Sequence, residues 1–231
     1  MDGNQPRRIL AVDTTTPHGS VAVLEEDRVL AEIAVASPTT HSARLLSSIH
    51  VLLESVGLDI RAIDGFAVTP GPGSFTGIRI GLSTVKAFAF ASGRPVAPVS
   101  SLRALAWKFR EVPGLAAPML DAKKGEIYAA LFAVSADGLV EIVPQGAYTP
   151  DAFLASLPPD RAITVIGSGI GVCGDKIVSA LGSNVHFSLR SPFTAAEVGL
   201  LGRAVLAANQ GISAEALEPL YFRKSQAEDK D

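Results

Sequence analysis

The two halves of the chain show the same order of strand and helix patterns. This internal repeat limits the number of folds that the sequence can adopt. In the first half, short apolar runs bounded by polar turns predict strands over 9–13, 20–24, 29–36 and 63–69. Apolar residues at the spacing of one helix face predict helices over 41–57 and 75–92. In the second half, the same patterns predict strands over 116–121, 125–134, 138–143 and 162–166, and helices over 150–157 and 170–181. Each half therefore has the order βββαβα.

Two such units in tandem predict an α/β protein of two ribonuclease-H-like lobes. The 231 residues are enough for two lobes of about 100 residues each. We expect the first lobe, which would bind a partner, over 1–100 and the second over 101–223, followed by a disordered tail over 224–231. A last helix over 194–209 could pack back on the first lobe.

Composition excludes several classes of protein. The formal net charge is −3, which lacks the basic footprint of a protein that binds nucleic acid on its own. The one cysteine, Cys173, excludes an internal disulfide and a multi-cysteine zinc cluster, and the four histidines have no partner at helical spacing. No apolar stretch reaches the roughly 18 residues of a membrane span, so we expect a cytoplasmic protein that binds neither membrane nor metal.

Two polar segments at predicted strand ends are candidates for a nucleotide site. Asp13, followed by threonines, could hold hydrated magnesium or phosphate, or could simply form an Asx turn capped by hydroxyls. The glycine-rich turn 70–73 before a helix could cradle a phosphate, or its glycines could serve a tight turn and close packing. It is not a P-loop, because the chain contains no GxxxxGK[ST] pattern. The residues of this remnant nucleotide site would be Asp13, Thr14, Thr15, Gly71, Gly73 and Ser74, with Ser74 also predicted as a helix N-cap.

The two long helices of the first lobe carry more apolar surface than a small lobe can easily bury. The helix over 75–92 is apolar nearly all round, and the helix over 41–57 has a wide apolar arc. This favours a protein–protein surface over purely intramolecular packing. We expect its residues to be Leu46, His50, Leu53, Gly77, Gly81, Thr84 and Phe88, with the two glycines and Phe88 at its centre.

Five segments of the chain resemble the TsaB (YeaZ) family. They are ILAVDTTT (9–16), HSARLL (41–46), TPGPGSFTGIRIG (69–81), DAKKGEIY (121–128) and PLYFR (219–223). The resemblance implies an actin-like (ASKHA) two-lobed fold and a role in making threonylcarbamoyladenosine at position 37 of tRNAs that read ANN codons. It implies a scaffold subunit that binds and activates the TsaD transferase, is joined by the ATPase TsaE, and reaches tRNA only through the complex.

The chain departs from the paralogous transferase at one informative place. TsaD carries an HxxxH metal pair, whose two positions fall at Ser101 and Leu105 here, and neither side chain replaces an imidazole ligand. The resemblance therefore implies a non-catalytic subunit with no catalytic residues, no metal and no cofactor, although ATP or ADP could bind at low affinity. Isolated, it would form a homodimer through its helical surface. The alternatives are a small-molecule kinase of the same superfamily, a metalloprotease-like hydrolase and a self-associating structural protein.

Overall fold

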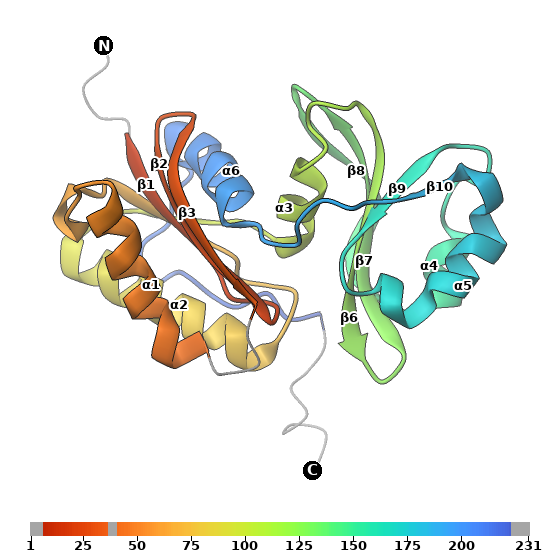
Figure 1. Cartoon of the computed structure of the whole chain (residues 1–231), viewed down its shortest axis with the longest axis horizontal. Coiled ribbons are helices and arrows are strands. Elements are labelled where there is room, and N and C mark those ends of the chain that lie inside the picture. Colours follow the sequence, from red (N-terminus) through yellow and green to blue (C-terminus); the bar gives the residue numbers. More distant parts are fainter. Residues whose placement is uncertain (1–6, 37–40, 223–231) are drawn as a thin grey trace. The chain divides into compact units, whose positions relative to one another are not determined.

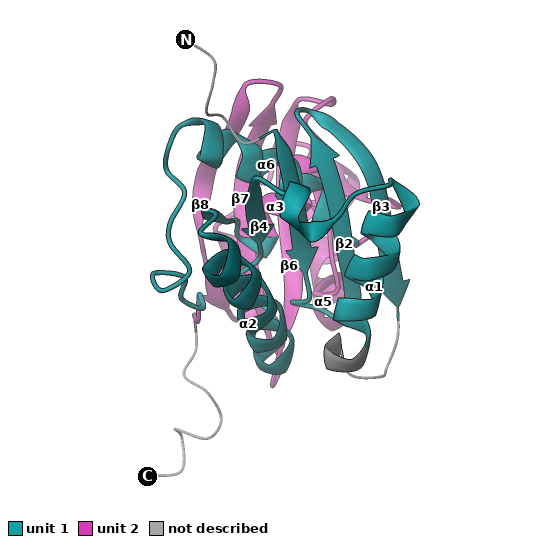
Figure 2. Cartoon of the chain, turned by 90° about the vertical axis from the view of Figure 1, so that its left-hand side faces the viewer, with its two compact units in different colours: residues 1–101, 193–220 teal, residues 102–192, 221–231 magenta. Residues whose placement is uncertain are grey.

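The computed structural model describes residues 7–36 and 41–222, which divide into two compact units (Figure 2). Unit 1 contains the described residues of 1–101 together with 193–220, and unit 2 contains those of 102–192 together with 221 and 222. The sequence-based division gave 101–223 to the second lobe and allowed the last helix to pack back on the first lobe; residues 193–220, which contain that helix, lie in unit 1. The predicted tail, 224–231, lies outside the described residues.

Unit 1 is built on a five-stranded sheet in the order β3-β2-β1-β4-β5. Its strands are β1 (Arg8–Asp13), β2 (His18–Glu25), β3 (Arg28–Ala36), β4 (Gly65–Val68) and β5 (Val96–Pro98). Strand β1 pairs antiparallel with β2 and parallel with β4, so it lies at the centre of the sheet. Its side chains are buried on both faces, which explains why the run 9–12 is continuously apolar rather than alternating.

Helices cover both faces of this sheet (Figure 1). They are α1 (His41–Ser55), α2 (Phe75–Ser92) and α6 (Ala195–Ala207), with a short 3-10 turn η1 (Ile60–Ala62) before β4. Leu10 and Val12 of β1 pack in the core formed with α1 and α2. On the opposite face, α6 approaches so closely that a Cβ on Gly199 or Gly202 would meet side chains of the sheet.

Unit 2 repeats the architecture with a sheet in the order β10-β9-β6-β7-β8. Its strands are β6 (Gly114–Lys123), β7 (Glu126–Ser135), β8 (Gly138–Tyr148), β9 (Ile163–Ile166) and β10 (Val185–Phe187). Its helices are α3 (Ser101–Trp107), which begins at the last residue of unit 1, α4 (Pro150–Ala155) and α5 (Ile170–Leu181), followed by the 3-10 turn η2 (Gly182–Asn184). Two separate apolar cores flank the sheet, one with α4 and α5 and one with α3.

The predicted order βββαβα is present in both units, and each sheet has a fifth strand that the prediction missed. The missed elements are β5, β10 and α3. Both missed strands are three residues long, too short to show an alternating pattern. Helix α2 has the predicted bounds, and α5 contains one residue with non-helical backbone angles, Cys173. In the part of the chain that the structure describes, no helix is both long and apolar enough to cross a membrane.

Candidate functional site

Asp13 ends the central strand of unit 1 and its side chain is buried. The residue pairs with Ser20 of β2, and Thr69 follows the neighbouring parallel strand β4. The carboxyl ends of β1 and β4 thus meet at one edge of the sheet, where ligands bind in open α/β folds. Only 2% of the Asp13 surface is exposed, so its carboxylate depends on partners within the protein.

The carboxylate of Asp13 accepts four hydrogen bonds from the chain itself. Oδ1 accepts from the backbone N–H of Thr15 at 2.9 Å, from the Thr15 hydroxyl at 2.7 Å and from the Thr69 hydroxyl at 2.7 Å. Oδ2 accepts from the hydroxyl of Thr194, the residue before α6. The bond from the Thr15 N–H is the Asx turn that was one of the two interpretations of this segment. Each oxygen of the carboxylate thus accepts at least one hydrogen bond from the chain itself.

The glycine-rich turn 70–73 is packed against the chain's own backbone. A Cβ on Gly71 would lie 2.5 Å from the carbonyl oxygen of Leu220, and a Cβ on Gly73 would overlap the carbonyl oxygen of Thr15. The backbone N–H of Ser74 donates to that same Thr15 oxygen at 2.6 Å. Both glycines also have φ between +130° and +156°, which side chains rarely adopt. The glycines therefore serve close packing and backbone conformation at this turn.

Helix α2 begins at this turn and packs on Thr14. Ser74 is its N-cap, as predicted, because the Ser74 side chain accepts a hydrogen bond from the N–H of Gly77 at 3.3 Å. The buried Thr14 hydroxyl donates to the carbonyl oxygen of Gly77 at 2.7 Å. A Cβ on Gly77 would overlap the Thr14 backbone, and one on Gly81 would overlap the Thr14 hydroxyl.

The structure therefore corrects part of the predicted partner surface. Gly77 and Gly81 are buried and face the β1–β2 turn of their own unit, so they cannot form the centre of an exposed surface. Leu53 is also buried, with 5% of its surface exposed, in the core of unit 1. Phe88 is partly buried and stacks on Phe66 at a ring-centroid distance of 6.1 Å. Periodicity groups residues on one helix face, but it does not say which face the sheet covers.

Other residues of the predicted surface are accessible. Leu46 is 58% exposed, His50 is exposed and Thr84 is half-buried. The structure adds exposed apolar residues that the sequence interpretation missed. We define the outer helical surface as the exposed residues Leu46, His50 and Val51 of α1 with Phe75 and Phe90 of α2. Both helices lie on one face of the unit 1 sheet (Figure 2).

The unit 2 counterpart of Asp13 is Asp121, near the end of β6. Its carboxylate accepts from the backbone N–H of Lys123 at 2.7 Å and pairs with the Lys123 ammonium at 2.7 Å. Burial alone would raise the pKa of Asp121, but the hydrogen bonds and charge of Lys123 outweigh burial and hold the pKa below its usual value. The glycine turn that follows β9 is again tightly packed, since a Cβ on Gly167 would overlap the Met119 backbone. The Asp121 carboxylate is therefore also bonded within its own unit, to Lys123 two residues further along the chain.

No metal centre is formed by side chains of residues 7–36 and 44–222, where no group of three His, Cys, Asp or Glu residues comes together. At the two positions where the paralogous transferase would carry histidines, Ser101 donates its hydroxyl to the carbonyl oxygen of Pro72 at 2.6 Å. Leu105 packs in the α3 core of unit 2. Both side chains thus have structural contacts.

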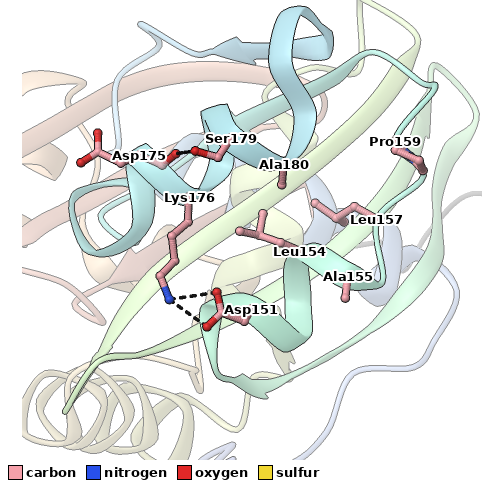
Figure 3. Close-up of a pocket in the computed structure, with 9 residues that line it drawn as sticks. All are labelled: Asp151, Leu154, Ala155, Leu157, Pro159, Asp175, Lys176, Ser179 and Ala180. Carbon is pink, nitrogen blue, oxygen red and sulfur yellow. Dashed lines mark hydrogen bonds and ion pairs between the residues drawn. The ribbon is translucent and has the colours of Figure 1, made fainter.

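A hollow in unit 2 lies between α4 and α5 (Figure 3). Its lining is mainly apolar, including Leu154, Leu157 and Ala180, and the Lys176 ammonium lies 2.8 and 2.9 Å from the two carboxylate oxygens of Asp151. Lys176 and Asp151 are exposed to solvent and form an ion pair with each other. The hollow thus presents neither a nucleophile with an adjacent base nor a ligand set for a metal.

Comparison with known proteins gives consistent similarities along most of the chain. The family model described as tRNA N6-adenosine threonylcarbamoyltransferase (TsaD) matches residues 32–228. The tRNA threonylcarbamoyladenosine biosynthesis protein TsaB of Bacillus subtilis is 31% identical over 225 residues, which cover 96% of each chain. A crystal structure from Pseudomonas aeruginosa, described as an uncharacterized protein with similarity to peptidase YEAZ, matches with a TM-score of 0.81 and 29% identity, covering 94% of this chain and 99% of that one.

A more distant similarity concerns the fold alone. A ROK hexokinase from Thermus thermophilus matches with a TM-score of 0.50 and 12% identity, covering 85% of this chain and 98% of that one. Together with the two mixed five-stranded sheets, these similarities confirm the predicted α/β fold of the actin-like (ASKHA) type.

Proposed function

The chain belongs to the TsaB (YeaZ) family, and from that membership we propose that it is a non-catalytic scaffold subunit in threonylcarbamoyladenosine biosynthesis. In this role it binds the TsaD transferase and activates it for modification of ANN-decoding tRNAs. The ATPase TsaE joins the complex, and tRNA is reached through the complex rather than by this chain alone.

The observation that carries the proposal is the outer helical surface. Phe90 is 74% exposed, Leu46 is 58% exposed and Val51 is 52% exposed, all on two neighbouring helices of unit 1. Aromatic and large aliphatic side chains exposed on neighbouring helices are typical of a protein-binding site. The match of the chain to the TsaD family model suggests a partner with equivalent helices, and a helix-to-helix contact between two related subunits buries such faces naturally.

The hydrogen bonding of the remnant nucleotide site supports the non-catalytic part of the proposal. A kinase of this fold needs a carboxylate able to act on a bound nucleotide or substrate hydroxyl. The Asp13 carboxylate is instead hydrogen-bonded to Thr15, Thr69 and Thr194. The space beside the glycines of the turn is occupied by backbone atoms of Thr15 and Leu220. A metalloprotease would need a set of ligands of the kind that residues 7–36 and 44–222 do not bring together.

The test is an omission experiment with purified proteins from the same genome. Threonylcarbamoyladenosine on an ANN-decoding tRNA is measured by mass spectrometry in a mixture of threonylcarbamoyl-adenylate synthase, TsaD, TsaE and this chain. We expect modification only when the chain is present, and we expect it to co-purify with TsaD. Full modification without the chain would contradict the proposal, and ATP turnover or peptide hydrolysis by the isolated chain would favour one of the enzymatic alternatives.

A further inference from the structure

The chain passes between its two units at three points. The passages follow Ser101, precede Phe193 and follow Leu220. On the unit 1 side, each passage is fixed by hydrogen bonds to a small group of residues around Asp13 and the glycine-rich turn. These segments are far apart in the sequence, so only the tertiary structure brings their anchoring points together.

The first passage is fixed by Ser101. Its backbone N–H donates to the carbonyl oxygen of Gly71 at 3.0 Å, and its hydroxyl donates to the carbonyl oxygen of Pro72 at 2.6 Å. Ser101 is 2% exposed, so these are buried bonds that water does not readily replace. The start of α3 is therefore tied to the middle of the glycine-rich turn.

The third passage is fixed at the neighbouring residue of the same turn. The backbone N–H of Leu220 donates to the carbonyl oxygen of Pro70 at 2.8 Å. Leu220 also lies so close to Gly71 that no side chain fits there. The turn residues 70–72 thus accept hydrogen bonds from two different connecting segments.

The second passage is fixed by Thr194, immediately after the chain re-enters unit 1. Its hydroxyl donates to Oδ2 of Asp13. The backbone N–H groups of Thr194 and Ala195 both donate to the Ser20 hydroxyl oxygen, at 3.3 and 3.0 Å. The first residues of α6 are therefore held by the ends of β1 and β2.

Asp13 connects these anchoring points into one network. Its Oδ1 accepts from Thr69, which directly precedes the turn, and from Thr15, whose carbonyl oxygen accepts from Ser74 at the other end of the turn. Both ends of the turn are thus fixed through Asp13 and Thr15, while Oδ2 of Asp13 holds the α6 segment. We call these residues, Asp13, Thr15, Thr69, Thr194 and the turn 70–74, the Asp13 network.

We propose that the Asp13 network is a conformational anchor that holds all three connecting segments on unit 1 and couples them to one another. Asp13 and the glycine-rich turn resemble a phosphate-binding site in their sequence pattern. In this proposal they instead fix the segments that connect the two units of the chain itself. Asp13 acts as a positioning residue, because its contacts are with the chain itself. The inference does not depend on the function proposed above.

Hydrogen exchange of the full-length chain, followed by mass spectrometry, tests the coupling. Thr194→Val replaces the hydroxyl of Thr194 by a methyl group, so the side chain keeps nearly the same shape but can no longer donate a hydrogen bond. We expect exchange at least tenfold faster at 194–196, and also faster exchange at Ser101 and Leu220, which Thr194 does not contact in the network. Asp13→Ala should accelerate all three segments further.

Leu52→Ala is the matched control, because Leu52 is buried in the core of unit 1 and is not a member of the Asp13 network. It should lower the global stability while leaving the three segments at their wild-type rates relative to the rest of unit 1. The proposal is overturned if Thr194→Val affects only the residues next to it, or if Asp13→Ala accelerates unit 1 uniformly as Leu52→Ala does. Should Asp13→Ala fail to fold, the result with Thr194→Val decides.

Discussion

The Thr14 hydroxyl donates a hydrogen bond to the carbonyl oxygen of Gly77, 63 residues along the chain, at 2.7 Å. This bond holds the first turns of α2 against the end of β1, with Gly77 and Gly81 facing Thr14. The close approach is what the two glycines four residues apart permit. They therefore shape the inside of unit 1 rather than a surface for a partner.

Substitution of Gly77 by alanine should destabilise the fold. The new Cβ would overlap the Thr14 backbone, which cannot move as a flexible side chain would, so we expect a loss on the order of 3 kcal/mol in the free energy of unfolding. Ser83→Ala, at an exposed position of the same helix, should change it by less than about 0.5 kcal/mol. Urea denaturation of both variants measures the difference, and equal midpoints would show that α2 tolerates a larger separation from Thr14.

Gly81→Arg should unfold unit 1 locally, because its side chain would have to displace the Thr14 hydroxyl. Loss of partner binding in this variant would therefore report a folding defect and not a blocked surface. Circular dichroism and thermal denaturation of the isolated variant separate the two effects. A Gly81→Arg protein with wild-type stability would contradict this interpretation of α2.

The outer helical surface gives the sharper test of partner binding. Phe90→Arg and Leu46→Arg change exposed residues, so the fold should keep its stability within about 0.5 kcal/mol. If Phe90 is a buried anchor in the complex, its loss should weaken TsaD binding by about 2 kcal/mol or more, which is roughly 30-fold. Isothermal titration calorimetry measures the affinity directly.

Val140→Arg is the control for these variants, since Val140 is 64% exposed on β8 of unit 2 and is not part of the outer helical surface. It should bind TsaD like the wild type.

The outer helical surface should also support a homodimer of the isolated chain, so sedimentation should show Phe90→Arg as a monomer. Wild-type TsaD affinity in Phe90→Arg and in Leu46→Arg would place the partner surface elsewhere.

ATP should bind weakly or not at all to the isolated chain. The donors from Thr15, Thr69 and Thr194 already occupy the Asp13 carboxylate, so bound nucleotide would have to replace buried hydrogen bonds. We expect a Kd for ATP weaker than about 1 mM, corresponding to less than about 4 kcal/mol of binding free energy. Micromolar affinity in calorimetry that disappears in Asp13→Asn would revive the kinase alternative.

Cys173 should react slowly with thiol reagents in the folded protein. The side chain is 3% exposed, its thiol donates to the carbonyl oxygen of Gly169 at 3.4 Å, and burial raises its pKa above the usual value. The pKa of Cys173 is therefore higher in the folded protein than in the unfolded chain, where it is about 8.5. The neutral thiol stabilises the folded state fully below that pH, and this stabilisation is lost as the pH rises through the folded pKa.

Labelling with a thiol-specific reagent at neutral pH should therefore be much faster in urea than in buffer, and the unfolding free energy should fall above about pH 8.5. Cys173→Ser, which lacks the titrating thiol, should remove this part of the pH dependence. Equal labelling rates in the folded and unfolded protein would mean that the start of α5 opens readily.

Sequence patterns alone determined the βββαβα order within each unit, the bounds of α2 with its Ser74 cap, and the family resemblance of the glycine-rich segment. These features depend on neighbouring residues, since a helix cap, a tight turn or a buried central strand is specified within a few positions of the chain. The strands β5 and β10 are too short to leave such a local signal.

Only the tertiary structure decided which face of α2 is buried and what the Asp13 carboxylate does. Periodicity placed Gly81 and Phe88 on an apolar face but could not show that Thr14 fills the space beside Gly81. The partners of Asp13 include Thr69 and Thr194, which are 56 and 181 residues away. Hydrogen bonds of such sequence separation exist only after the sheet has formed and α6 has returned to it, so no local pattern could distinguish a ligand site from an internal anchor.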